Sequence, residues 1–194
     1  MSSNVEVLEK ATTEKTAAGL TTWSLDNAHT NAEFSVRHMM IASVRGEFRE
    51  VTGSLQLDKN NIEQSSVHVQ IKTASVQTND ASRDAHLRSA DFFDVENYPE
   101  MSFHSTKWEQ KSDDEILVRG DLTIHGVTKE VTFKAEGPTE EVTDPWGNQR
   151  IGFSAKTKIN RKDFGLSWNV ALEAGGILVG EDVSIAIEAQ FIKA

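Results

Sequence analysis

Apolar and polar side chains alternate with a period of two along most of this chain, in runs separated by short polar turns. Such alternation is typical of β-strands that bury one face, and strands of this kind pair in the antiparallel direction. His125-Gly126, between two of the runs, is typical of a tight hairpin. We therefore predict an all-β domain of about eight to nine strands. The runs cover residues 34–40, 44–48, 53–57, 67–71, 101–105, 116–124, 131–135, 151–159 and 183–191.

Closure of these strands into a barrel is favoured over two packed sheets. The runs are long, and long open strand edges would invite aggregation. Gly46, Gly53 and Gly120 fall on predicted inward faces, where glycine marks a sharp bend or a close approach to the backbone. An eight-stranded barrel has an interior that side chains fill or that holds one slender ligand. Small inward residues favour a hollow interior, but large neighbours would fill the same space, so both outcomes stay open.

Three segments depart from the alternation. Residues 1–21 are polar and predict a flexible N-terminal extension to a single domain over residues 22–194. Residues 80–93 predict one short helix. Residues 161–180 mix aromatic side chains with glycines and predict a long irregular connection, and connections of this length are often functional.

The composition argues against several classes of function. The formal net charge of −10 argues against nucleic acid as a partner, because phosphate binding needs a basic surface. The chain has no cysteine, which excludes disulfides, thiolate metal sites and a cysteine nucleophile. The N-terminus lacks a charged start followed by an apolar run, and no later stretch approaches the roughly 18 apolar residues of a membrane helix. We therefore expect a cytoplasmic protein without an integral membrane segment.

Several short motifs follow one another in a specific order. The first stretch carries Trp23, Asp26, His29, Phe34, Val36, His38, Gly46 and Phe48. Later matches are Arg83, Asp84, His86 and Leu87, then FFDVENYP at 92–99, GDLTIHGVTKEV at 120–131, RKDFGL at 161–166 and VGEDVSIAIEAQ at 179–190. This ordered set, over about residues 22–192, resembles the YceI-like, polyisoprenoid-binding protein family. The resemblance implies an eight-stranded antiparallel lipocalin-like barrel with a helix over one end. It also implies a long isoprenoid chain inside, on a quinone or a prenyl phosphate, with no catalytic step established.

Polar residues near the predicted barrel mouth are candidates for contact with a ligand's head group. His38 lies on the apolar face of its strand, where it either satisfies an internal hydrogen bond or contacts a quinone or phosphate. Arg83 and His86 share one face of the short helix, so they bind the head group if that face looks into the barrel and are surface charges if it does not. Asp84 and Arg88 have the spacing of an ion pair on the same helix.

Apolar side chains in the runs and loops are candidates for the cavity wall. Taken singly, each is also an ordinary core residue, and methionine adds a surface that adapts to a flexible chain. Phe164 and Trp168 lie on the long connection and are candidates for a gate. The predicted wall residues are Phe34, Met40, Phe92, Phe93, Phe103, Phe153, Phe164 and Trp168.

These observations predict a protein that binds a hydrophobic small molecule, an isoprenoid lipid or isoprenoid quinone, for sequestration, storage or transport. Catalytic residues, a metal site and any cofactor other than that ligand are not expected, because the histidines are scattered and the chain lacks HExxH, Gly-x-Ser-x-Gly and glycine-rich phosphate-loop motifs. Two alternatives stay open, namely an enzyme acting on a small hydrophobic substrate and a structural or stress-related protein with a solid barrel. A homodimer that meets through the 161–180 connection is a further prediction.

Overall fold

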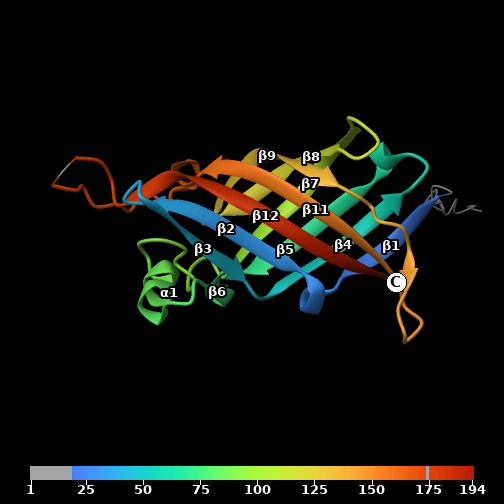
Figure 1. The fold of residues 1–194 in the computed structure, drawn as a ribbon, viewed down its shortest axis with the longest axis horizontal. Helices are drawn as coiled ribbons and strands as arrows, with labels where there is room; N and C mark the ends of the chain where they lie inside the picture. Colours follow the sequence, from blue (N-terminus) through green and yellow to red (C-terminus); the bar gives the residue numbers. More distant parts are fainter. Residues whose placement is uncertain (1–18, 174) are drawn as a thin grey trace, which may run out of the picture.

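The computed structural model describes residues 19–173 and 175–194. Eight antiparallel strands form a closed barrel, because β12 pairs with β1 on one edge and with β11 on the other (Figure 1). The predicted all-β barrel is therefore confirmed. In ring order its strands are β1 (Leu20–Leu25), β4 (Val51–Asp58), β5 (Ser66–Lys72), β7 (Glu100–Gln110), β8 (Ile116–Ile124), β9 (Val127–Glu136), β11 (Gln149–Asn160) and β12 (Val179–Lys193).

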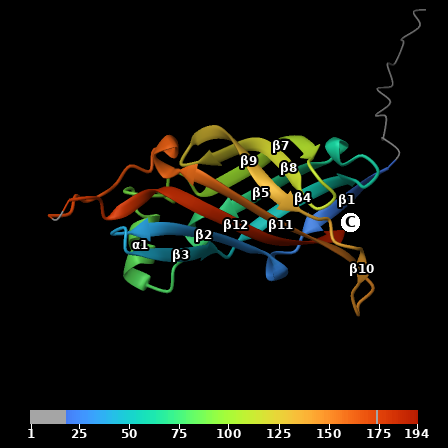
Figure 2. The same ribbon diagram turned by 45° about the horizontal axis from the view of Figure 1, so that its top comes forward.

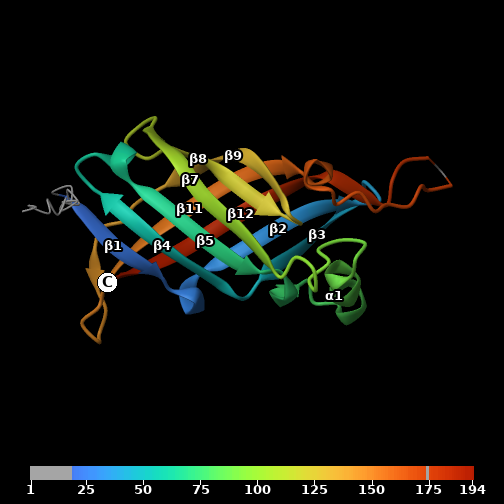
Figure 3. The ribbon, with the colours of Figure 1, turned by 180° about the vertical axis from the view of Figure 1, so that it is seen from behind.

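The length of β12 gives the barrel two different ends. The C-terminal part of one β12 edge pairs with β1, and the N-terminal part of the same edge pairs with β2 (Asn31–His38). β2 pairs in turn with β3 (Ala42–Phe48), and β3 pairs with the short β6 (Val76–Gln77). These strands extend the wall beyond β1 and toward the helix α1, as Figures 1 and 3 show. We call the end at α1 the open end and the end at β1 the closed end.

The remaining elements are short. The α-helix α1 (Ala81–Arg88) is capped by Asp80, whose carboxylate accepts the Arg83 N–H at 3.0 Å. The predicted helix over 80–93 is too long, because the chain turns after Arg88 and the Phe93 N–H returns to the Leu87 carbonyl. The other elements are β10 (Val142–Thr143) and the 3-10 turns η1 (Asn27–His29), η2 (Ile62–Gln64), η3 (Thr73–Ser75) and η4 (Arg161–Phe164).

Hydrogen bonds from one face of α1 hold it against the segment that precedes it. The buried Asp84 carboxylate accepts the N–H and the hydroxyl of Thr78, at 2.8 and 2.6 Å. Arg88 donates to the backbone carbonyls of Ala74 and Val76, at 2.8 and 2.7 Å. The predicted Asp84–Arg88 ion pair is therefore wrong, since each side chain satisfies the segment before the helix instead of its helical neighbour.

The sequence predicts the end of the N-terminal extension and the hairpin at His125-Gly126. β1 begins at Leu20, so residues 20 and 21 belong to the sheet and not to the predicted extension, while residues 1–18 lie outside the described residues. The hairpin predicted at His125-Gly126 joins β8 and β9, with φ of 51° and 72° at the two positions. Two successive residues with positive φ are typical of a type I′ turn, which confirms this hairpin.

The closed end holds the main hydrophobic core. Trp23 is fully buried there, and its Nε1–H donates to the Thr21 hydroxyl at 2.8 Å. Buried side chains from strands all around the barrel surround it, so this end is filled by protein. The cluster consists of Trp23, Leu55, Leu57, Trp108, Ile116, Val118, Phe133, Ala135, Ile151 and Phe191.

A charged network joins three segments of the chain. Arg150 on β11 donates to Asp26 at 2.5 Å and to Asp144 at 2.7 Å. Asp26 also contacts His29 Nδ1 at 2.8 Å. The hydrogen bonds from Arg150 hold the pKa of Asp26 and of Asp144 below the usual range of an aspartate. Two of the motif residues, Asp26 and His29, thus belong to this network and do not line the barrel interior.

In Arg150→Met we expect a lower Tm than in the wild type at pH 7, and a smaller difference at about pH 2.5. An aspartate whose pKa is lower in the folded chain stabilises the fold above its unfolded pKa, and this contribution is lost as the pH falls through the folded value. Thermal melts of both proteins at the two pH values measure the difference. Arg119→Met is the control, because Arg119 forms an exposed pair with Glu130 at 3.8 Å. An equal difference at both pH values would contradict the electrostatic role of Arg150.

Candidate functional site

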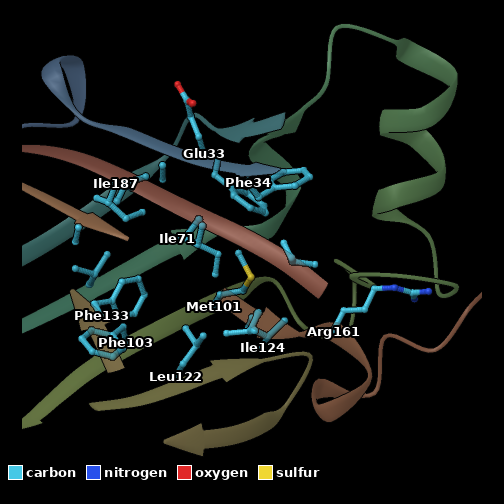
Figure 4. A pocket seen from close by; sticks show the side chains of 18 of the residues that line it. Glu33, Phe34, Ile71, Met101, Phe103, Leu122, Ile124, Phe133, Arg161 and Ile187 are labelled. Atoms are coloured by element: carbon cyan, nitrogen blue, oxygen red, sulfur yellow. The ribbon is translucent and has the colours of Figure 1, made fainter. Parts of the chain in front are cut away.

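The barrel encloses an apolar cavity of about 390 Å³ that extends from the core to the open end. This volume falls in the range of small-molecule sites. Figure 4 shows inward side chains from several strands around it, among them Ile71, Met101, Leu122 and Ile124. The wall is thus built by the alternating apolar positions of the strands, as the period of two requires.

Several wall residues keep accessible surface although they lie inside the barrel. Val67, Val69 and Ile71 on β5 are only half-buried, as are Ile185 and Ile187 on β12, and all five line the cavity. In a solid barrel, facing side chains would cover them. The barrel is therefore hollow, which contradicts the solid-barrel alternative.

The inward glycines are not the source of this space. A Cβ atom on Gly46 would lie 2.4 Å from Cζ of Phe34, and one on Gly120 would lie 2.6 Å from Cζ of Phe103. Both aromatic rings lie directly over the glycine backbone, which only glycine permits. At these two positions large neighbours fill the space that the small residues leave, and the cavity lies instead between the half-buried aliphatic side chains.

The cavity has an aromatic floor toward the closed end. Phe153 lies edge-on to Trp108, with 6.0 Å between the ring centroids, and to Phe191, with 6.1 Å. All three side chains line the cavity, and Trp108 and Phe191 are buried. A ligand inside the barrel would meet mainly hydrocarbon and aromatic surface at this depth.

The mouth at the open end is polar and cationic. His86 on α1 lies edge-on to Trp168, with 4.6 Å between the ring centroids, and its Nε2 lies 2.8 Å from Asp91. Arg83 on the same helix donates to the Thr78 hydroxyl at 2.7 Å. His86, Trp168 and Arg83 line the cavity, and so does His38 at the end of β2. The helix face that carries Arg83 and His86 therefore does look into the barrel.

Arg161 is a further cation at the mouth. It is 3% exposed, lines the cavity, and donates to the carbonyl oxygens of Gly180, at 2.8 Å, and Leu166. The nearby Glu181 pairs with Lys162 at 2.5 Å, and burial lowers the pKa of Arg161. Backbone carbonyls thus solvate this guanidinium in place of water. In the sequence Arg161 stands out only as part of the RKDFGL motif, because no local pattern distinguishes a buried arginine from a surface one.

The charged side chains that line the cavity at its open end are positive. Arg83 and Arg161 line the cavity, and Glu33 and Arg37 also border it, but these two are exposed and lie on the outward face of β2. Figure 4 shows the Glu33 carboxylate pointing away from the cavity, whereas Arg161 lies at the open end near α1. The mouth therefore favours electron-rich ligand atoms even though the chain as a whole carries a net charge of −10.

Most of the predicted site residues come together in this cavity. Met40 does not, because β2 ends at His38 and Met40 lies in the hairpin turn with 63% of its surface exposed. Phe164 does not either, since it is 2% exposed and packs in a core cluster with Ile124 and Leu166. The predicted residues that line the cavity are Phe34, His38, Arg83, His86, Phe92, Phe93, Phe103, Phe153 and Trp168.

The described ranges, 19–173 and 175–194, contain neither a metal-binding cluster nor a membrane-spanning helix. Among these residues no three His, Asp or Glu side chains are grouped so that they could hold a metal ion. In the same ranges no helix has the length and apolar character needed to cross a membrane. The histidines at the mouth come from different elements, β2 for His38 and α1 for His86.

Solved structures with the same architecture include three that are informative. The YceI protein of Campylobacter jejuni is 30% identical, with a TM-score of 0.66, and the match covers 81% of this chain and 90% of that one. BcnA of Burkholderia cenocepacia is 20% identical, with a TM-score of 0.75 and coverage of 86% and 98%. A polyisoprenoid-binding domain of Saccharophagus degradans is 15% identical, with a TM-score of 0.65 and coverage of 90% and 99%. The last two show the shared fold alone.

Sequence relatives give the family. A UPF0312 protein of Pseudomonas putida is 42% identical over 141 residues, which are 73% of this chain and 73% of the relative. A UPF0312 protein of Vibrio cholerae is 41% identical over 141 residues, 72% of this chain and 73% of the relative. The YceI-like domain matches residues 23–191, nearly all of the barrel and its mouth. The chain therefore belongs to the family of YceI-like domain proteins.

Proposed function

We propose that this protein holds the long chain of an isoprenoid lipid or isoprenoid quinone in its barrel, and so sequesters, stores or transports it. One observation carries the proposal, an apolar cavity with an aromatic floor and a cationic mouth. This shape suits a ligand with a long hydrocarbon tail and one polar end. Each buried methylene contributes about 0.8 kcal/mol, so several isoprene units suffice for tight binding after ordering costs. The related fold of the polyisoprenoid-binding domain of Saccharophagus degradans supports the ligand class.

In this proposal the polar end of the ligand lies at the mouth, and the tail points to the floor. His38, Arg83 and Arg161 line the mouth and carry N–H groups. A quinone carbonyl and a phosphate both accept such hydrogen bonds, so both head groups fit this site. Arg161 contributes positive charge near such a head group, and its three guanidinium nitrogens also donate to the backbone carbonyls of Gly180, Leu166 and Val179.

Extraction of the purified full chain with organic solvent, followed by mass spectrometry, tests the proposal. We expect an isoprenoid compound in an amount approaching one molecule per protein, which delipidated protein takes up again when the same compound is added. Bound lipid with straight acyl chains only would contradict the isoprenoid identity. Protein that neither carries nor takes up any apolar molecule would contradict the function altogether.

We infer further that the protein binds its ligand without converting it, which agrees with the binding role named for one structural neighbour. The alternative, an enzyme for a small hydrophobic substrate, requires that an added isoprenoid emerges changed, so the same mass spectrometry distinguishes the two. The cytoplasmic location and the homodimer stay predictions. Light scattering of the full chain measures the oligomeric state directly.

A further inference from the structure

Four exposed apolar side chains gather beside the cavity mouth. Met39, Met40 and Ile41 form the tip of the β2–β3 hairpin and are 40%, 63% and 79% exposed, and Val170 on the neighbouring connection is 46% exposed. The Met39 N–H donates to the Leu178 carbonyl at 2.8 Å, and the Leu178 N–H donates to the Val170 carbonyl at 3.0 Å. We call Met39, Met40, Ile41 and Val170 the mouth patch. Because Leu178 lines the cavity, the mouth patch is continuous with the cavity rim.

The backbone of the hairpin tip is unfavourable for its residues. Met39 and Met40 have φ of 50° and 60°, in the left-handed region that side chains other than Gly, Asn and Asp rarely adopt. The Ile41 N–H closes this β-turn on the His38 carbonyl at 3.1 Å, and hairpin turns with positive φ at both central residues strongly prefer Asn-Gly there. The chain therefore holds two exposed methionines in a costly conformation, and residues held in this way gather at functional sites.

Charge and size together select the partner of the mouth patch. The hairpin part of the mouth patch is basic, since residues 35–45 contain Arg37 and Arg45 and neither Asp nor Glu, while the connection that carries Val170 contains Glu173. Four side chains are far fewer than the roughly 20–30 residues that each side of a standard protein interface supplies. Shallow insertion of a few apolar side chains, flanked by cations, is one way in which proteins bind to the surface of a lipid bilayer.

We propose that the mouth patch inserts into the surface of a phospholipid bilayer, with the cavity opening against the membrane. The β2–β3 hairpin, the connection before β12 and α1 all lie at this end in Figure 1, so contact here presents the mouth to the lipid. The purpose of the contact rests on the proposed function, since an isoprenoid chain would then pass between bilayer and barrel without crossing water. The contact itself depends only on the exposed side chains.

Flotation of the full chain with vesicles of phosphatidylcholine containing one fifth phosphatidylglycerol, and no isoprenoid, tests this contact. The decisive variant is Met39→Asn/Met40→Gly, which supplies the residues that the turn prefers. We expect it to melt at a higher temperature than the wild type, because the turn is relieved, and to partition onto vesicles about tenfold less. If the methionines instead stabilised the fold, the variant would melt at a lower temperature than the wild type.

Trp146→Ala is the matched control. Trp146 is 82% exposed, more than any residue of the mouth patch, but it follows β10 at the other end of the barrel (Figure 2). We expect its vesicle binding to equal that of the wild type. Equal loss in both variants would mean that any exposed apolar residue drives the binding, and it would overturn the proposal.

Two other results would also overturn it. One is vesicle binding that Met39→Asn/Met40→Gly leaves unchanged. The other is a wild-type dimer that the same variant converts to a monomer in light scattering, which would make the mouth patch a seam between two copies. Ligand content, measured separately by extraction, distinguishes this proposal from the proposed function. Protein that carries an isoprenoid but does not bind vesicles would contradict only the membrane contact. Protein that binds vesicles through the mouth patch but carries no ligand would contradict only the proposed function.

Discussion

Replacement of Ala155 by Trp is expected to lower the amount of isoprenoid that co-purifies with the protein by about tenfold or more. Ala155 lies on β11, opposite Ala135 on one side and Ile187 on the other, and all three line the cavity. An indole ring at this position occupies space that we assign to the ligand tail. Exclusion of only two methylenes costs about 1.6 kcal/mol of binding, which already corresponds to more than tenfold.

The fold of Ala155→Trp is expected to persist, because the added ring enters a hollow and not a filled core. Lys156→Trp is the matched control, since Lys156 is the next residue on the same strand and is exposed on the outer face. Extraction and mass spectrometry of both variants measure the ligand, and circular dichroism monitors the fold. Ligand content that stays at the wild-type level in a folded Ala155→Trp protein would contradict the position assigned to the tail.

Trp23→Ala is expected to lower the free energy of unfolding by about 3–5 kcal/mol, the usual cost of removing a large aromatic side chain from a core. Trp23 is 0% exposed and packs at the closed end, where β1 closes the ring between β4 and β12. The truncation leaves a void among well-packed neighbours and leaves the Thr21 hydroxyl without its indole partner. For a chain of this size the change corresponds to a fall in Tm of roughly 6–20 °C.

Thermal or urea unfolding of Trp23→Ala and of Trp146→Ala measures this effect with a matched pair of residues. The same substitution at Trp146, which is 82% exposed, is expected to change the stability by less than about 0.5 kcal/mol. A loss below about 1 kcal/mol in Trp23→Ala would show that the closed end repacks, and the aromatic floor would then not be a rigid boundary for the ligand.

The alternation of side chains correctly predicted which residues face the barrel interior, but not where each strand stops. Phe34 and His38 fall on the cavity side because a strand alternates strictly between its faces. Met40 continues the same period, yet β2 ends at His38, and Met40 enters a turn. The turn itself was hidden, because Met-Met lacks the Asn-Gly signal that marks such hairpins. The unusual presence of two methionines in this turn is also what indicates the mouth patch.

The local sequence pattern also could not predict which charged side chains are buried. Arg83 and His86 could be paired from their helical spacing, whereas the direction of their helix face needed the contacts of α1 with the barrel. Asp84 and Arg88 had the spacing of an ion pair, but Thr78 and backbone carbonyls are their partners. Arg161 follows β11 directly and reaches the carbonyl of Gly180, nineteen residues later. Hydrogen bonds between distant segments decide these cases, and a short motif contains no information on them.

The sequence by itself determined that this chain is built of antiparallel strands with a single short helix, because a period of two over many runs leaves each strand one apolar face to bury. The barrel followed from this alternation together with the resemblance to the YceI-like family. The sequence also determined the family, through the order of its motifs. Only the tertiary structure decided that the barrel is hollow and which end is open. The inward glycines suggested space for the wrong reason, since Phe34 and Phe103 cover two of them. Whether an interior is filled depends on how side chains from opposite strands meet across it, and that depends on strand register and closure rather than on any one strand.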